Sequence, residues 1–220
     1  DYLLEACAQP FPQAEVTAAD VLCTWSGVRP VVGAADSQAK PSNETREHVL
    51  WQEPGCVTLA GGKLTTFRPQ AIEVLRACAG MLGKTLEDDG TPVFQAVPLQ
   101  AIPGLSAAGL RRLAGRHGRD LPRLARLIRS LGSECVGASD TLWAELAFAA
   151  EAEMVLHLDD LLLRRTRLGL LLPDGAAHYL PDIRRLCQPR LGWDDTRWEQ
   201  EQQRYLQLWQ RHHSVPCASI

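Results

Sequence analysis

A glycine-rich stretch between a short apolar run and a predicted amphipathic helix contains residue types that bind anions and cofactors. Residues 60–69 read Ala-Gly-Gly-Lys-Leu-Thr-Thr-Phe-Arg-Pro and directly follow the apolar residues 56–59. Two adjacent glycines leave a backbone that a ligand can approach closely, and the two threonine hydroxyls can cap a helix or bind a ligand. The lysine adds positive charge, and the free N–H groups of a helix N-terminus favour an electron-rich ligand atom. The pattern therefore predicts a strand, a loop and a helix N-terminus that hold an anion or a cofactor.

The stretch does not match the P-loop of nucleotide-binding proteins. That pattern, G-x-x-x-x-G-K-[ST], needs a hydroxyl residue after the lysine and a glycine five residues before the second glycine. Here Leu64 follows Lys63, and Val57 stands five residues before Gly62. Taken alone, the stretch is equally compatible with a glycine-rich turn that precedes a helix, so the surrounding motifs have to distinguish the two interpretations.

Two arginines upstream of the glycines are candidate anion ligands. Arg29 lies within residues 21–32, an apolar run rich in β-branched and aromatic residues that predicts a buried strand. Because a buried unpaired charge is very costly, Arg29 needs either a carboxylate partner or an anionic ligand such as phosphate, which matches the planar guanidinium group. Arg46 enters a predicted hairpin of residues 45–51 and 56–60, where it is either a surface residue or a second ligand.

The composition excludes several classes of protein. A hydrophobic content of 45% is typical of a soluble globular protein, and a net charge of −3 does not indicate a nucleic-acid partner. The sequence contains no run of 18 apolar residues, so it predicts no membrane-spanning helix. The seven cysteines are widely spaced without a C-x-x-C pair, which favours reduced thiols over a disulfide framework or a metal site.

The sequence after the glycine-rich stretch predicts a long helix, then a boundary segment, and then a domain made of helices. Apolar residues at helical spacing predict a helix over residues 68–81, which must pack on something larger than the hairpin. Residues 84–104 are rich in glycine and proline and mark a domain boundary. We therefore predict an α+β fold, with strand, hairpin and helix over residues 1–97 and an all-helical domain over 98–220. Its predicted helices begin at Ser106, Asp120 and Ser139, and the last two cover about 175–188 and 194–212.

An arginine-rich segment opens the predicted helical domain. Residues 105–130 contain seven arginines and a single acidic residue, Asp120. Such a segment could dock on anionic lipid headgroups or on a partner, or it could be the solvated face of two helices. The sequence leaves both interpretations open.

Four segments together resemble the FAD-dependent glycerol-3-phosphate dehydrogenases. They are residues 20–30, which include Ser-Gly-Val-Arg-Pro, residues 45–48 (Thr-Arg-Glu-His), residues 61–68 (Gly-Gly-Lys-Leu-Thr-Thr-Phe-Arg), and residues 151–166. Their order and spacing are similar to the family over nearly the whole chain. The family is about twice as long and begins with a dinucleotide-binding unit that needs G-x-G-x-x-G, a pattern this sequence does not contain. The chain resembles the C-terminal portion only, which we expect to be inactive by itself and not to hold FAD.

The resemblance implies roles for individual residues. It implies that residues 1–97 are the C-terminal part of a FAD- and substrate-binding domain. Arg29 and Arg46 would be catalytic and substrate-binding, one clamping the phosphate and the other steadying a substrate oxygen, with the assignment open. Lys63 would contact both substrate and cofactor. The implied cofactor-binding set is Gly61, Gly62, Lys63, Leu64, Thr65 and Thr66, of which the last three would place N–H groups near the flavin N1/O2 edge.

The reaction implied by the resemblance is oxidation of sn-glycerol 3-phosphate to dihydroxyacetone phosphate by hydride transfer to FAD. Electrons would then pass to quinone, or to oxygen in oxidase members. The resemblance also implies a cytoplasmic protein, peripheral on the inner membrane in respiratory members, and oligomers are possible. The alternatives are a helical interaction or membrane-docking module of such an enzyme, and another phosphate-binding flavoenzyme.

Overall fold

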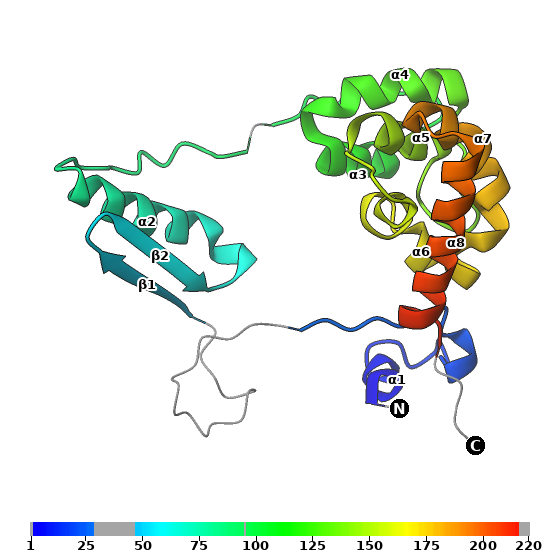
Figure 1. Cartoon of the computed structure of the whole chain (residues 1–220), viewed down its shortest axis with the longest axis horizontal. Coiled ribbons are helices and arrows are strands. Elements are labelled where there is room, and N and C mark those ends of the chain that lie inside the picture. Colours follow the sequence, from blue (N-terminus) through cyan, green and yellow to red (C-terminus); the bar gives the residue numbers. More distant parts are fainter. Residues whose placement is uncertain (1, 29–46, 95, 216–220) are drawn as a thin grey trace. The chain divides into compact units, whose positions relative to one another are not determined.

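The computed structural model describes residues 2–28, 47–94 and 96–215 (Figure 1). The chain separates into two compact units. The small unit is Gly27–Gln95, and the helical unit combines Asp1–Ser26 with Ala96–Ile220. In the described part of the chain, helices dominate and the sheet has two antiparallel strands, as the predicted α+β fold requires. The assignment of residues 1–97 to a flavin and substrate domain stays a prediction.

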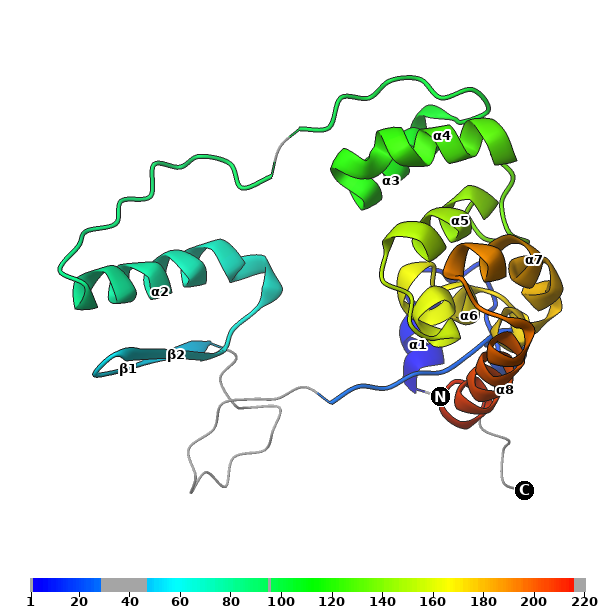
Figure 2. The ribbon, with the colours of Figure 1, turned by 45° about the horizontal axis from the view of Figure 1, so that its top comes forward.

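The small unit consists of a hairpin and one long helix. Strands β1 (His48–Glu53) and β2 (Cys56–Gly61) pair in a register that joins His48 to Gly61 and Glu53 to Cys56. Gly55 closes the turn with a φ of +77°, a conformation that glycine adopts without steric cost. A 3₁₀ turn, η2 (Leu64–Thr66), leads into α2 (Phe67–Met81), which lies along one face of the hairpin (Figures 1 and 2). The predicted hairpin and helix are confirmed.

The small unit has almost no core of its own. Among its described residues, the only buried one is the polar Gln70. Apolar side chains on and beside α2 are open to solvent, with Leu75 50% exposed and Leu82 72% exposed. A hairpin and one helix bury too little apolar surface to offset the conformational entropy of folding. The prediction that α2 packs on a larger surface than this hairpin therefore stays a prediction.

The prediction of a buried strand over residues 21–32 is wrong for residues 21–28, the part that the structure describes. Residues 21–28 form no strand, and the side chains of Trp25 and Val28 are 72% and 99% exposed. Instead of a neighbouring strand, the backbone pairs with the C-terminal end of the last helix, because Thr24 N–H donates to the His213 carbonyl at 2.8 Å. The Cys23 thiol also donates to the Leu170 carbonyl at 3.3 Å, which ties this segment to the helical unit.

Five longer helices and several shorter helical elements form the helical unit, and both kinds contribute buried residues to its core. The helix start predicted at Ser106 is confirmed, because the Ser106 hydroxyl caps the helix by accepting from Gly109 N–H at 3.0 Å, and at the start of the last helix Asp194 accepts from Arg197 N–H at 2.7 Å. The elements are α1 (Tyr2–Ala8), η1 (Ala18–Asp20), α3 (Ala107–His117), η3 (Gly118–Asp120), α4 (Leu121–Leu131), α5 (Trp143–Ala152), the π-helix η4 (Asp160–Arg165), α6 (Leu168–Leu171), η5 (Pro173–Tyr179), α7 (Leu180–Leu191) and α8 (Asp195–His212).

The helix predicted to start at Ser139 begins four residues later and is shorter than expected. The Ser139 hydroxyl donates to the Val136 carbonyl at 2.8 Å, and Val136 N–H donates to the Thr141 carbonyl at 2.8 Å. These bonds close a turn over residues 136–141 that competes with a helix, as serine hydroxyls often do. Helix α5 therefore starts at Trp143.

Helix α5 joins two apolar clusters that form the core of the helical unit. Leu146 belongs to the cluster around Trp198 and Tyr205, both 0% exposed, whereas Phe148 belongs to the cluster around α3 and α4. The helix lies between the α3–α4 pair and the remaining helices of its unit (Figure 2). Residues 144–149 of α5 are buried, and this stretch is apolar except for Glu145, which is 2% exposed, whereas Glu151 near the end of the helix is exposed.

Candidate functional site

Two consecutive glycines give the loop after β2 its shape. Gly61 and Gly62 have φ angles of +80° and +86°, in the region that side-chain-bearing residues rarely adopt. A Cβ atom on Gly62 would lie 2.1 Å from Nε2 of Gln70, the buried amide of α2. The loop is therefore packed directly against α2, and only glycine fits at position 62.

A short hydrogen-bond chain fixes the start of α2. Gln70 Nε2 donates to Thr66 Oγ1 at 2.8 Å, and the Thr66 hydroxyl donates to the Lys63 carbonyl at 2.9 Å. Thr66 N–H donates to the same carbonyl at 3.0 Å. Thr66 therefore holds the loop closed with both its hydroxyl and its amide. This role was not predicted, although a threonine just before a helix and a glutamine four residues later can hydrogen-bond to each other.

The loop leaves two adjacent backbone donors available. Among the hydrogen bonds between described residues, none uses the N–H of Leu64 or of Thr65. The Leu64 side chain is 87% exposed, and Lys63 beside it is exposed. Two free amides, the positive end of the α2 dipole and one ammonium group make this surface electropositive. Such a surface can hold an electron-rich atom of a ligand.

Two side-chain contacts near the loop link residues that are distant in sequence. His48, which pairs with Gly61 across the hairpin, places Nε2 2.5 Å from Oε2 of Glu73 on α2. Arg68 in the first turn of α2 places Nη2 2.5 Å from Oδ1 of Asp88, and these contacts raise the pKa of Arg68 and lower that of Asp88. The sequence pattern does not predict either contact, because the two partners are 25 positions apart in the first and 20 in the second.

Two predicted site residues, Arg29 and Arg46, lie outside the described residues. The other six predicted residues, Gly61 to Thr66, are consecutive in the sequence and run from the last residue of β2 to the end of η2. The predicted convergence of the two arginines on that loop stays a prediction.

The arginine-rich segment is partly explained by buried carboxylates of the helical unit. Arg112 donates to both carboxylate oxygens of Glu145, with Nη2 at 2.6 Å from Oε2, and His117 Nε2 lies 3.3 Å from Oε1. Burial alone would raise the pKa of Glu145, but hydrogen bonds from His117, Arg112 and Leu142 N–H bring it down to about 2. This cluster joins α3 to α5, so we interpret it as a structural device.

Comparison with known proteins identifies one family over most of the chain. The family model described as the C-terminal domain of alpha-glycerophosphate oxidase matches residues 55–198, a range that includes the glycine loop, α2 and nearly all of the helices beyond them.

Similar curated proteins have related names. The chain is 27% identical over 193 residues to the aerobic glycerol-3-phosphate dehydrogenase of Staphylococcus haemolyticus, with 76% of this chain and 34% of that protein covered. It is 31% identical over 209 residues to glycerol-3-phosphate dehydrogenase 2 of Mycobacterium tuberculosis, covering 87% and 35%. It is 29% identical over 233 residues to a mitochondrial glycerol-3-phosphate dehydrogenase of Arabidopsis thaliana, covering 92% and 37%.

The chain spans about a third of the length of the curated relatives that it matches. The matched range contains both the glycine loop and the helical region that the sequence analysis had singled out. The chain therefore belongs to the family of the C-terminal domain of alpha-glycerophosphate oxidase.

Proposed function

We propose that this chain is the C-terminal part of a flavoprotein that oxidises sn-glycerol 3-phosphate to dihydroxyacetone phosphate. The hydride would pass to FAD and the electrons then to quinone. The observation that carries the proposal is that proteins named glycerol-3-phosphate dehydrogenase match 76% to 92% of the chain, through the glycine loop as well as the helices. The remaining two thirds of such a protein would supply the dinucleotide-binding unit.

The geometry of the glycine loop fits a flavin. FAD, when bound, supplies the acceptor for the hydride removed from the substrate carbon. The free N–H groups of Leu64 and Thr65 would donate to the electron-rich edge of the ring, and the charge of Lys63 would favour the added negative charge. Thr66 N–H is already bonded to the Lys63 carbonyl, so it contributes by holding the loop in shape. The bare backbone at Gly61 and Gly62 would allow close approach.

The substrate phosphate would be bound by Arg29 and Arg46. A guanidinium group offers a planar fork of donors that matches phosphate, and two such groups suit a dianion. A charge-assisted hydrogen bond from such a group to the phosphate would contribute about 1.5–3 kcal/mol.

Replacing Arg29 should weaken substrate binding in the full-length protein. For Arg29→Ala we expect the KM for sn-glycerol 3-phosphate to rise about thirtyfold, which corresponds to about 2 kcal/mol for a lost charge-assisted bond. Steady-state kinetics with a dye acceptor measure the effect. Arg111→Ala is the matched control, because Arg111 is an exposed arginine of the helical unit. If the two variants have the same KM for sn-glycerol 3-phosphate, Arg29 does not bind the substrate.

Docking on an anionic membrane surface is a second candidate function, proposed for the helical unit. No helix among the described residues is both long and apolar enough to cross a membrane. Three of the seven arginines contact the carboxylates of Glu145 or Glu151, but the other four are exposed and make no ion pair with a described residue. These four are Arg111, Arg119, Arg126 and Arg129. Together they support electrostatic attraction to lipid headgroups, on the cytoplasmic face of the inner membrane in a bacterium.

Liposome sedimentation tests the membrane candidate. We expect the full-length protein to sediment with vesicles that contain phosphatidylglycerol at low salt and to be released as salt is raised, because screening weakens surface attraction. Arg126→Glu combined with Arg129→Glu should reduce the bound fraction several-fold. If the bound fraction changes neither with salt nor with these substitutions, the four arginines have no role in membrane binding.

A further inference from the structure

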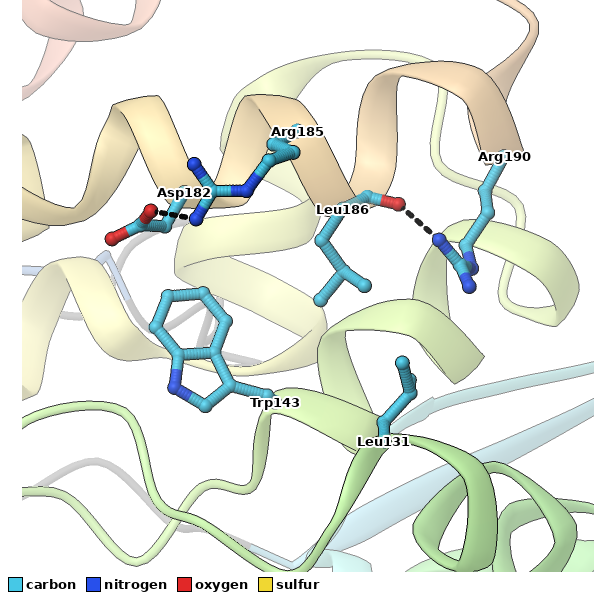
Figure 3. Close-up of a pocket in the computed structure, with 6 residues that line it drawn as sticks. All are labelled: Leu131, Trp143, Asp182, Arg185, Leu186 and Arg190. Atoms are coloured by element: carbon cyan, nitrogen blue, oxygen red, sulfur yellow. Dashed lines mark hydrogen bonds and ion pairs between the residues drawn. The ribbon is translucent and has the colours of Figure 1, made fainter.

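A hollow in the helical unit combines apolar walls with two guanidinium groups. It has a volume of about 390 Å³ and lies between the end of α4, the start of α5 and one side of α7 (Figure 3). Ligand sites in proteins have volumes of this order and pair apolar walls with a few polar groups. The lining residues are Leu131, Trp143, Asp182, Arg185, Leu186 and Arg190.

The apolar walls are fixed by the core of the unit. Trp143 and Leu186 are half-buried and pack against the larger apolar cluster, whereas Leu131 is 36% exposed at the end of α4. Figure 3 shows the Trp143 ring below α7, with Leu131 and Leu186 beside it. These three side chains offer a preformed contact for a small apolar group, which costs little reorganisation on binding.

The two guanidinium groups keep donors available for an anion. Arg190 uses Nε for Glu151 at 3.1 Å and Nη1 for the Leu186 carbonyl at 2.5 Å, and its Nη2 has no partner among the described residues. Arg185 is paired with Asp182 through one nitrogen only, and its side chain is 76% exposed. An exposed ion pair of this kind is weak and can open to admit a ligand.

The local charge balance favours a negative ligand. Glu151 is shared between Arg190 and Arg123, whose Nη2 lies 3.5 Å from the second carboxylate oxygen. One carboxylate therefore faces two guanidinium groups, and among the described residues Asp182 is the single acid paired with Arg185. The groups in and around the hollow carry net positive charge, so an anion would be attracted and a cation repelled.

We propose that this hollow is a binding site for a small anion that carries an apolar group, a carboxylate or phosphate ester with an aryl or short alkyl body. The anionic group lies between Arg185 and Arg190 and displaces Asp182 from Arg185, and the apolar body contacts Trp143 and Leu186. The site lies in the helical unit and its existence does not depend on the oxidation of glycerol phosphate.

Three probes separate the contributions of charge and apolar body. Phenyl phosphate carries both features, phenol only the body, and inorganic phosphate only the charge. Binding is followed in the 220-residue chain by the indole N–H resonance of Trp143, assigned with Trp143→Phe. We expect saturable binding of phenyl phosphate at least tenfold tighter than that of either simpler probe. No shift of this resonance, or equal affinity for phenol, would overturn the proposal.

Two substitutions on α7 should change the affinity in opposite directions. Arg185→Gln removes a donor that is largely exposed, so the fold should be retained and phenyl phosphate should bind about fivefold more weakly. Asp182→Asn removes the competing carboxylate and should strengthen binding about threefold. Arg111→Gln, an exposed arginine outside the hollow, should change nothing. Unchanged affinity in both α7 variants would show that the probe binds elsewhere, for instance at the proposed substrate site, and would overturn the assignment.

Discussion

Glu145→Gln should lower the free energy of unfolding of the helical unit by about 3–5 kcal/mol, the usual cost of breaking a buried charge pair. The Glu145 side chain is 2% exposed and accepts from Arg112, from His117 and from Leu142 N–H at 2.9 Å. The NH₂ group of a glutamine at this position would face the N–H donors that now bind the carboxylate. The guanidinium group of Arg112 and the ring of His117 would also lose their carboxylate partner. His117 Nδ1 is already a buried atom without a hydrogen-bond partner among the residues that the structure describes.

Urea denaturation followed by far-ultraviolet circular dichroism measures this loss. Glu134→Gln is the matched control, because Glu134 is exposed in the same unit and its carboxylate contacts no described residue. A loss no larger than that of the control would contradict a structural role for the cluster.

The same carboxylate predicts how stability depends on pH. The pKa of Glu145 is depressed from its ordinary value of 4.5 to about 2, so its contribution is complete above pH 4.5. As the pH falls from about 4.5 to about 2, the unfolded chain takes up a proton at this carboxylate while the folded protein does not, so about 3 kcal/mol of stability is lost. In Glu145→Gln this part of the acid dependence should disappear, whereas Glu134→Gln should retain it.

Gly62→Ala should weaken FAD binding in the full-length protein on the order of 50-fold. The φ of +86° at this position disfavours any side chain, and the new methyl group would collide with Gln70, which holds Thr66. Strain of about 1–2 kcal/mol and one lost hydrogen bond of about 1 kcal/mol together give this factor. The loop that presents the Leu64 and Thr65 amides would move away from its ligand.

Gly80→Ala provides the control for this substitution. Gly80 lies on α2, its φ is not positive, and an added Cβ meets no atom within 4 Å. Alanine should be tolerated or slightly stabilising there, because it is the better helix former. FAD affinity is measured by titrating the apoprotein and following flavin fluorescence. Equal affinities in the two variants would mean that the shape of the glycine loop does not matter for FAD.

Local signals in the sequence predicted most of the elements. The paired strands of the hairpin, the apolar spacing of α2 and the cap at Ser106 each act over a few residues, so they can be recognised without knowing the fold. The glycine loop was predicted for the same reason, since its positive φ angles require glycine at those positions.

The errors and omissions arose where distant residues decide the structure. Residues 21–28 have the composition of a strand, but Thr24 pairs with His213 from the other end of the sequence. The Arg112–Glu145 pair joins residues that are 33 positions apart, and no periodicity could reveal it. In the candidate site, the sequence left helix capping and ligand binding open for the Thr66 hydroxyl, and the structure shows that this hydroxyl bonds to Gln70 and to the Lys63 carbonyl.

Anaerobic reduction of the flavin by substrate tests the proposed activity most directly. The full-length protein, purified with its FAD, is mixed with sn-glycerol 3-phosphate or with glycerol, and the absorbance of the oxidised flavin is recorded. We predict that sn-glycerol 3-phosphate bleaches this absorbance with an equal yield of dihydroxyacetone phosphate, that glycerol does not, and that the 220-residue chain alone binds no FAD. A flavin-loaded protein whose spectrum stays unchanged after addition of sn-glycerol 3-phosphate would contradict the proposal.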